Sequence, residues 1–169
     1  MPLLNPDHLL DQAERLISSP SRGAPRQADL RRAISNAYYA VFHAILAQAA
    51  DDLIGSTHRS SSRYALIYRS VDHRSLRNLC EDVVKPKLPA RYAKYALREG
   101  FGLDLVALAI AVIELQEKRY LADYDPLYRV GMSDTKSVIA TSRRALIRFK
   151  SADRALRGTF LDLLLFSPR

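Results

Sequence analysis

Cysteine is almost absent from this sequence of 169 residues, and the single one, Cys80, has no second cysteine with which to form a disulfide or a zinc cluster. We expect its thiol to be a small core side chain. The four histidines, His8, His43, His58 and His73, are widely separated, and none has a histidine or cysteine three or four residues away. The sequence therefore predicts no metal site and no cofactor.

Long apolar runs are also absent. No apolar stretch approaches the roughly 18 residues of a membrane-spanning helix, and residues 1–10 lack a basic region followed by a long apolar stretch. Apolar residues make up 48% of the chain and charged residues 26%, with 6 glycines and 8 prolines, which is ordinary globular composition. We therefore expect a cytoplasmic, soluble protein with a packed core, no membrane partner and a single domain over residues 1–169.

The sequence motifs of several common enzyme sites are missing. There is no G-x-x-x-x-G-K-[ST], no G-x-G-x-x-G, no H-E-x-x-H and no G-x-S-x-G. Nucleotide hydrolysis by a P-loop, zinc proteolysis and serine-hydrolase chemistry are therefore unsupported.

No segment alternates apolar and polar residues as a strand does, whereas helical spacing recurs along the chain. The pattern predicts helices over residues 7–18, 31–55, 60–84 (one or two helices), 101–124, and from an N-cap at Ser133-Asp134 onward. Residues 18–27 and 85–100 are predicted connections, the second with room for a short helical turn. The apolar residues 153–169 form a C-terminal helical extension that should dock on the body or on a partner. The fold class is thus an all-α bundle of four to five helices, with residues 29–54 and 101–123 as its central pair.

The net charge of +8 is unevenly distributed. Residues 56–98 carry 10 basic and 3 acidic side chains, and residues 129–169 carry 9 and 3, whereas residues 99–128 carry 2 and 6. Tyr64, Tyr68, Tyr92 and Tyr95 interleave with the first basic set. Such segments are typical of surfaces that bind nucleic-acid phosphates, although solvated helix faces that keep a protein soluble show the same pattern.

A polar stripe interrupts the long helix predicted over residues 31–55. At 100° per residue, Arg32, Asn36, Tyr39 and His43 lie within about 60° of one another. The rest of the helix is apolar nearly all round, as expected at the centre of a bundle or in contact with a second subunit.

Arg119 continues the buried row of the second long helix, with Asp123 one turn later beside it and Tyr124 next in the chain. If the two long helices pack antiparallel, an arginine and an imidazole can meet at one surface, the minimum for charge stabilisation and proton transfer on a phosphodiester. The alternative is structural: Arg119 pairs with Asp123, and His43 is a satisfied core residue.

Three segments together resemble the HEPN domains (higher eukaryotes and prokaryotes nucleotide-binding). They are RRAISNAYYAVFHAIL (residues 31–46), YRSVDHRSLRNLC (residues 68–80) and LQEKRYLADYDP (residues 115–126). With the apolar helix after Ser133, they cover most of residues 7–152. The resemblance implies a bundle of four or five helices, usually dimeric. Active members of the family are metal-independent ribonucleases or toxins paired with a nucleotidyltransferase antitoxin, and inactive members bind nucleotides or RNA or serve as partners.

The catalytic signature of that family is R-x4-6-H near the end of a long helix, with the two side chains converging in a dimer cleft. Arg119 matches the arginine, but Tyr124 stands five residues on, and no histidine follows Arg119. Tyrosine has a pKa near 10 and is a poor general base at neutral pH. This departure favours binding over cleavage.

Two functions of different classes follow from these features. The first is an RNA- or nucleotide-binding component of a toxin–antitoxin or defence-type system, which binds phosphates through Arg32, Asn36, Tyr39, Arg119 and the basic helical surfaces. The second is a metal-independent endoribonuclease toxin, in which Arg119 stabilises the phosphate and His43, Tyr124 or Asp123 replaces the absent histidine. A non-catalytic dimeric scaffold is a third possibility.

Self-association is expected from two apolar regions. The helix at residues 31–50 has more apolar rows than a small bundle needs, and residues 156–166 add a further apolar surface. The sequence therefore predicts a homodimer, with a hetero-complex, for example with a nucleotidyltransferase antitoxin, as the alternative.

Overall fold

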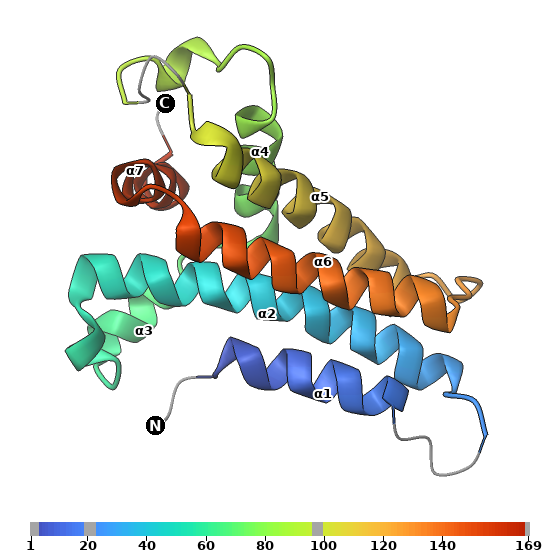
Figure 1. The fold of residues 1–169 in the computed structure, drawn as a ribbon. Coiled ribbons are helices and arrows are strands. Elements are labelled where there is room, and N and C mark those ends of the chain that lie inside the picture. The colour runs from blue at the N-terminus through green and yellow to red at the C-terminus, as the bar shows by residue number, and fades with distance from the viewer. Residues whose placement is uncertain (1–3, 19–22, 96–99, 168–169) are drawn as a thin grey trace.

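The computed structural model describes residues 4–18, 23–95 and 100–167, and within these ranges it contains seven α-helices and no strand (Figure 1). The helices are α1 (Pro6–Ser18), α2 (Gln27–Ile54), α3 (Ser62–Tyr68), α4 (His73–Val83), α5 (Gly102–Tyr124), α6 (Met132–Ser151) and α7 (Arg154–Leu165), with single 3-10 turns η1 (Ser56–His58) and η2 (Ala90–Tyr92). The all-α prediction is confirmed, whereas the predicted count of four to five helices is too low.

The higher count has local causes in two helix N-caps. The segment predicted as one or two helices divides because Asp72 accepts a hydrogen bond from the backbone N–H of Ser75 and starts α4. At the other end of the chain, Asp153 accepts hydrogen bonds from the backbone N–H groups of Ala155 and Leu156 and starts α7 as a separate helix.

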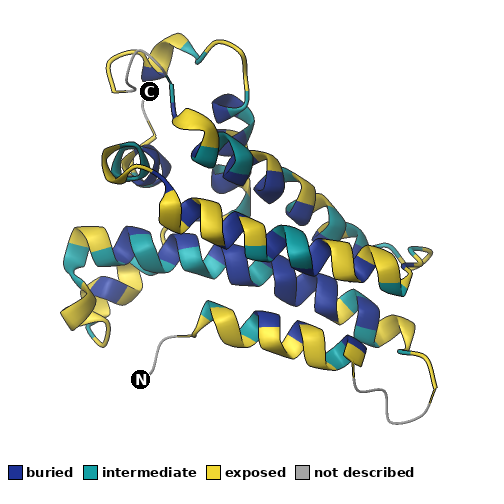
Figure 2. Cartoon of the chain, in the orientation of Figure 1, coloured by how far each residue is buried: buried dark blue, intermediate teal, exposed yellow. Residues whose placement is uncertain are grey.

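Helix α2 lies at the centre of the bundle and contacts α1, α5 and α6 (Figure 1). Its apolar residues are buried on nearly every side, as the dark blue of its middle turns shows (Figure 2). The central pairing of α2 with α5 is confirmed, and α6 packs on both helices. The apolar rows of α2 that suggested a second subunit are therefore covered within the chain.

Side chains at the start of α2 fix its position relative to the end of α5. Arg31 donates hydrogen bonds of 2.7 Å to the carbonyl oxygens of Ala122 and Asp125, which satisfies acceptors at a helix C-terminus and places a cation at its negative end. Gln27 exchanges hydrogen bonds of 2.9 and 3.1 Å with the backbone of Val130. These contacts set the register that brings the middle of α2 opposite the last turns of α5.

Helix α6 begins earlier than predicted. Its N-cap is Gly131, not Ser133-Asp134, and Thr135 is buried and donates a hydrogen bond of 2.9 Å to the carbonyl oxygen of Gly131. Met132 packs against the core, so apolar burial favours starting the helix at this residue rather than at the later Ser-Asp signal.

Helix α7 docks on the body, as expected for the apolar C-terminal extension. Phe160, Leu161, Leu163 and Leu164 are buried, and the ring of Phe160 meets that of Phe101 in an edge-on contact with centroids 6.2 Å apart. Burying an aromatic and three leucines stabilises this contact by several kcal/mol, at about 1.5–3 kcal/mol per large apolar side chain. The apolar surface that was the second argument for a dimer is thus also largely covered within the chain.

The connection between α4 and α5 is held by the buried carboxylate of Asp82. Asp82 accepts hydrogen bonds from Lys85 at 2.6 Å, from Tyr92 at 3.0 Å, and from Arg91. Burial would raise the pKa of Asp82, but these three donors together lower it, so that the carboxylate stays charged. The short helical turn expected in this connection is η2, whereas residues 96–99 of it, like residues 19–22 of the α1–α2 connection, lie outside the described residues.

Within the described ranges, no helix combines the length and apolarity needed to cross a bilayer. Cys80 is fully buried on α4, as expected for a small core side chain.

Candidate functional site

The guanidinium of Arg119 lies between α5 and α2, in a setting of aromatic rings. Arg119 is 8% exposed, and its Nη2 donates a hydrogen bond of 2.7 Å to the hydroxyl of Tyr39. The rings of Tyr38, Tyr39 and Tyr124 have centroids 5.7, 5.2 and 5.6 Å from the guanidinium carbon. A cation over ring faces is stabilised by their quadrupoles, and a planar guanidinium suits this geometry.

Asp123 is the charged partner of Arg119 and lies one turn further along α5. Its Oδ2 is 2.9 Å from Nε of Arg119, and its Oδ1 accepts a hydrogen bond from the hydroxyl of Ser35 on α2. Burial would lower the pKa of Arg119, but the hydrogen bond to Tyr39 and the charge of Asp123 raise it. The guanidinium of Arg119 is therefore fixed in position by these contacts and is permanently charged.

The histidine whose pKa is affected by the charge of this arginine is His73 rather than His43. The imidazole Nδ1 of His73 is hydrogen-bonded to the hydroxyl of Tyr38 at 2.8 Å, and its ring centroid lies 4.2 Å from that of Phe42 and 5.8 Å from that of Tyr39. Burial and the positive charge of Arg119 lower the pKa of His73, so its imidazole is neutral at pH 7.

His43 lies one turn beyond Tyr39 on α2 and belongs to the same aromatic row. Its Nδ1 is 2.7 Å from the hydroxyl of Tyr68, with which it forms a hydrogen bond, and its ring stacks on those of Tyr39 and Tyr68. Burial lowers the pKa of His43 and raises that of Tyr68. His43 is thus a hydrogen-bonded member of the row and does not contact Arg119 directly.

A surface hollow of about 180 Å³ opens beside Arg119. It is lined by Arg77, Gln116, Glu117, Arg119 and Tyr120. Two buried polar atoms at this hollow have no hydrogen-bond partner among the described residues: Oε1 of Gln116, and Nε of Arg119, whose N–H is not directed at the nearby Asp123 oxygen. Buried polar atoms are rarely left unpaired, so these two call for a ligand or water.

The hydrogen bond of the Gln116 side-chain amide determines whether a ligand must donate to its Oε1 or accept from it. Its Nε2 donates a hydrogen bond of 3.0 Å to the carbonyl oxygen of His73, which leaves Oε1 as an acceptor. Nε of Arg119 is a donor. Two of the residues that line the hollow thus each hold a buried polar atom without a hydrogen bond, one a cationic donor and the other a neutral acceptor. Arg77 at its edge adds a second guanidinium, which Glu81 contacts at 2.7 Å.

The structure brings together only some of the residues predicted from the sequence. Arg119, Asp123, Tyr39 and Tyr124 share one cluster, and His43 lies one turn away along α2. Asn36 is instead 5% exposed and donates a hydrogen bond of 3.1 Å to Gln12 on α1. The expected single polar stripe is thus divided, because two different helices cover it.

Arg32 is exposed on the first turns of α2, and no contact joins it to the cluster of Arg119 among the described residues. The sequence reasoning missed His73, Tyr38, Gln116 and Ser35. His73 had a usable signal, since it follows the N-cap Asp72 at the start of a helix and so lies at a helix end that faces a neighbouring element.

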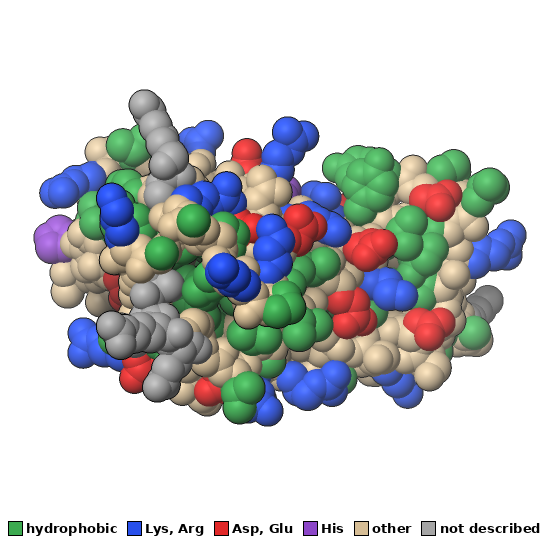
Figure 3. All heavy atoms as spheres, turned by 90° about the horizontal axis from the view of Figure 1, so that it is seen from above, with side chains coloured by type: hydrophobic (Ala, Val, Ile, Leu, Met, Phe, Trp, Pro, Cys, Tyr) green, Lys and Arg blue, Asp and Glu red, His purple; other side chains and the backbone are tan. Residues whose placement is uncertain are grey.

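Basic residues are exposed along α3, α4 and the connection that follows α4. Arg63, Arg69 and Arg74 are exposed on these helices or at their ends, and Lys87 and Lys94 are exposed in the connection that follows. Figure 3 views the molecule from the side on which α5 lies in Figure 1, and on this face Lys and Arg side chains are interspersed with acidic and apolar ones.

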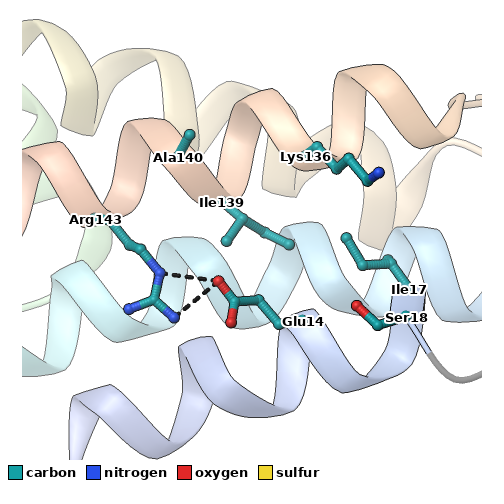
Figure 4. A pocket seen from close by; sticks show the side chains of 7 residues that line it. All are labelled: Glu14, Ile17, Ser18, Lys136, Ile139, Ala140 and Arg143. Carbon is teal, nitrogen blue, oxygen red and sulfur yellow. Dashed lines mark hydrogen bonds and ion pairs between the residues drawn. The ribbon is translucent and has the colours of Figure 1, made fainter.

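A second hollow, of about 310 Å³, lies between α1 and α6 (Figure 4). Glu14 and Arg143 approach within 2.8 Å across it, over the side chains of Ile17 and Ile139. Two of the three charged groups that line this hollow, Glu14 and Arg143, are paired with each other, so we assign it to packing of α1 on α6.

Fold and site together define an all-α protein with a buried arginine, a neutral histidine and a small polar hollow between α4 and α5. No protein-family model matches the chain, and neither does any curated protein or solved structure. In the described part of the chain, no group of three or more His, Cys, Asp or Glu side chains could hold a metal ion.

Proposed function

We propose that this protein is a HEPN-like RNA- or nucleotide-binding component of a toxin–antitoxin or defence-type system, and that it binds a ribonucleotide phosphate at the hollow beside Arg119. The observation that carries the binding proposal is that two residues lining that hollow hold buried polar atoms without a hydrogen bond: Oε1 of Gln116, and Nε of Arg119, which is ion-paired to Asp123 at 2.9 Å. The family assignment itself rests on the three sequence segments described above.

The chemistry of the two atoms favours a nucleotide over a simple anion. A phosphate oxygen would accept from the guanidinium groups of Arg119 and Arg77, and charge-assisted bonds of this kind are strong. A fully deprotonated anion such as sulfate has no hydrogen-bond donor for Gln116, whereas a ribose hydroxyl or a base amino group has one. Aromatic side chains at the edge, such as Tyr120 at 61% exposure, offer faces on which a base can stack.

The basic surface of α3 and α4 supports the same proposal. When one nucleotide of an RNA strand occupies the hollow, Arg63, Arg69 and Arg74 would contact other phosphates of the same strand. Such contacts supply affinity without sequence preference, whereas the hollow supplies the selectivity.

The experiment is fluorescence anisotropy with a short fluorescein-labelled single-stranded RNA and with the DNA of the same sequence, over a series of salt concentrations. Arg77→Ala and Arg119→Lys should each weaken RNA binding by about tenfold, because a lost bidentate or charge-assisted contact costs about 1.4 kcal/mol or more. Gln116→Met should weaken RNA binding more than DNA binding if the acceptor contacts a ribose hydroxyl.

The matched control is Arg154→Ala, which removes an exposed cation from the first turn of α7, away from the hollow. It should lower affinity slightly and equally for both nucleic acids. Equal losses in Arg77→Ala and Arg154→Ala would contradict a site at the hollow, and no RNA binding by the wild type at low salt would contradict the proposal as a whole.

A second candidate function is favoured by the position of His73. A neutral imidazole and a buried arginine together can cleave RNA without a metal. The imidazole accepts the proton of the 2′-hydroxyl as its oxygen attacks the phosphorus, and the guanidinium stabilises the phosphorane. The P–O5′ bond then breaks, the imidazolium returns the proton to the leaving 5′-oxygen, and a 2′,3′-cyclic phosphate remains. We therefore include metal-independent endoribonuclease activity, with His73 and Arg119 as its residues. Incubation of labelled RNA with EDTA, using His73→Asn and His43→Asn, tests it: cleavage should be lost in the first variant and retained in the second.

A further inference from the structure

One face of α2 binds the C-terminal end of α5 through a row of side chains four residues apart, which places them on the same side of the helix: Arg31, Ser35 and Tyr39. Arg31 and Tyr39, at the two ends of this row, hydrogen-bond the α5 backbone and the guanidinium of Arg119. Ser35, in the middle, donates a hydrogen bond to Oδ1 of Asp123. Helix α2 therefore contacts both partners of the Arg119–Asp123 ion pair.

The backbone around Asp123 is fixed, so the position of its carboxylate depends on rotation of the side chain. Arg31 binds the carbonyl oxygens of Ala122 and Asp125, before and after Asp123 in the chain, each at 2.7 Å. The Asp123 side chain is 25% exposed, which leaves it room to turn. Ser35 is 1% exposed, so its hydroxyl has a fixed place from which to donate to this carboxylate. The hydrogen bond from Ser35 thus sets the direction in which the carboxylate faces.

In this position the carboxylate balances the charge of Arg119 without forming a hydrogen bond to it. Oδ2 of Asp123 is 2.9 Å from Nε of Arg119, but the N–H of Nε is not directed at this oxygen and has no hydrogen-bond partner among the described residues. A guanidinium and a carboxylate that are free to turn frequently form a bidentate pair with two parallel N–H···O bonds. The hydrogen bond from Ser35 to Oδ1 keeps one of the two oxygens out of such a pair.

We propose that Ser35 is a positioning residue, which prevents Asp123 from pairing fully with Arg119 and so leaves the guanidinium available to a phosphate. This role rests on the proposed function, because it concerns the arginine that binds RNA phosphate at the hollow. Asp123 and the phosphate compete for one cation, and both form charge-assisted bonds with it. When the Ser35 hydroxyl is removed, the carboxylate turns toward Arg119, forms the missing hydrogen bond and competes more strongly with RNA.

Ser35→Ala tests this role in the anisotropy titration with the labelled single-stranded RNA. The substitution should weaken RNA binding by about three- to tenfold, because the competing ion pair becomes stronger. Ser35→Thr retains the hydroxyl and should bind RNA with nearly the affinity of the wild type. Circular dichroism of both variants verifies that the helical fold is retained.

Ser142→Ala is the matched control for the loss of a buried hydroxyl. Ser142 is fully buried on α6, and its hydroxyl donates a hydrogen bond of 2.9 Å to the carbonyl oxygen of Ala37 on α2. Like Ser35→Ala, this substitution removes one hydroxyl and its hydrogen bond from the core, but the acceptor is a backbone carbonyl rather than the Asp123 carboxylate. It should lower the melting temperature and leave RNA affinity unchanged. Equal losses of RNA affinity in the two alanine variants would overturn the positioning role.

A double-mutant cycle with Asp123→Asn identifies the group through which Ser35 acts. In the Asp123→Asn background the competing charge is absent, so Ser35→Ala should change RNA affinity by less than about twofold. If Ser35→Ala weakens binding equally in both backgrounds, its effect does not pass through the carboxylate and the proposal is wrong. Tighter RNA binding by Ser35→Ala would also contradict it, since the hydroxyl would then strengthen the competing ion pair.

A second measurement needs no RNA. In ¹H–¹⁵N NMR spectra of the full chain, the Nε–H signal of Arg119, assigned by its loss in Arg119→Lys, should exchange with water more slowly in Ser35→Ala than in the wild type, because the new hydrogen bond to Asp123 protects it. Unchanged exchange together with unchanged RNA affinity overturns the positioning role and leaves the proposed function standing. Slower exchange in a protein that does not bind RNA supports the hold of Ser35 on Asp123 and contradicts the proposed function instead.

Discussion

Arg119 on α5 donates a hydrogen bond of 2.7 Å to the hydroxyl of Tyr39 on α2, and this bond joins the two central helices at the candidate site. The Tyr39 ring also lies under the guanidinium, 5.2 Å from centroid to guanidinium carbon. One tyrosine therefore satisfies a buried charge both through its oxygen and through its ring.

Tyr39→Phe should separate these two contributions. The ring stays and the acceptor is lost, so the free energy of unfolding should fall by about 1.5–3 kcal/mol, the range for a hydrogen bond to a charged group. Tyr124→Phe is the control, because its ring lies at a similar distance from Arg119 but its residue is 62% exposed. Chemical denaturation should show little change for that variant. Equal losses in the two variants would mean that the Tyr39 hydroxyl is not a significant partner.

Arg119→Ala and Asp123→Asn should change the affinity for RNA phosphates in opposite directions. Removal of Arg119 deletes a buried cation that packs against three rings, and we expect a loss of about 2–4 kcal/mol of stability together with loss of RNA binding. Asp123→Asn removes the carboxylate that competes with a bound phosphate, so RNA affinity should stay equal or rise, at a smaller cost in stability.

Thermal denaturation and RNA titration of both variants give the comparison. If Arg119 serves only as the structural partner of Asp123, the two substitutions lower the melting temperature alike and neither changes RNA affinity beyond what unfolding explains. Binding by Arg119→Ala that remains salt-dependent and as tight as in the wild type would move the phosphate site elsewhere on the basic surface.

Stability should decline at mildly acidic pH because of His43 and His73. Burial lowers the pKa of both imidazoles in the folded state, so the unfolded chain binds protons more readily than the folded one. Stability from these groups is therefore present above the unfolded pKa of about 6.5 and is lost as the pH falls below it. Urea denaturation at several pH values between about 7 and 5 measures this loss.

Substitution assigns the pH effect to individual histidines. His73→Asn retains a polar group near the Tyr38 hydroxyl and should reduce the fall in the free energy of unfolding between pH 7 and about 5. Adding His43→Asn should reduce this fall further. A wild-type stability that is constant through this range would contradict a neutral, buried state for both imidazoles.

The sequence predicted the fold well where periodicity and burial agree. The two long helices, the burial of Arg119 on its apolar row and the docking of the C-terminal extension all follow from apolar spacing, which local sequence shows directly. The helix count and the start of α6 were wrong because both depend on which of several competing cap signals tertiary packing selects, as with Gly131 over Ser133.

The site was only partly predictable, because its members come from three helices. Asp123 follows Arg119 at helical spacing and was therefore found. The N-cap Asp72 places His73 at a helix start, but its approach to the cluster depends on the packing of α4 on α5. Asn36 shows the converse: its place on the polar stripe was read correctly from the helical angle, but α1 covers that edge of α2 and takes up its side chain.

The docked C-terminal helix should contribute to the stability of the whole chain. Phe160 on α7 is fully buried and meets Phe101 edge-on, so Phe160→Ala should lower the free energy of unfolding by about 3–5 kcal/mol, the cost of removing a buried aromatic ring. Phe166 lies just past the end of α7 and is 60% exposed, which makes Phe166→Ala a control of identical chemistry with an expected loss under about 0.5 kcal/mol. Urea denaturation followed by circular dichroism measures both.

If α7 were a loosely attached tail, Phe160→Ala would instead leave the main unfolding transition in place, and limited proteolysis of the wild type would remove residues after 152 without unfolding the remainder. A single transition that shifts as one for Phe160→Ala shows that α7 unfolds together with α2 and α5, as its burial against both predicts.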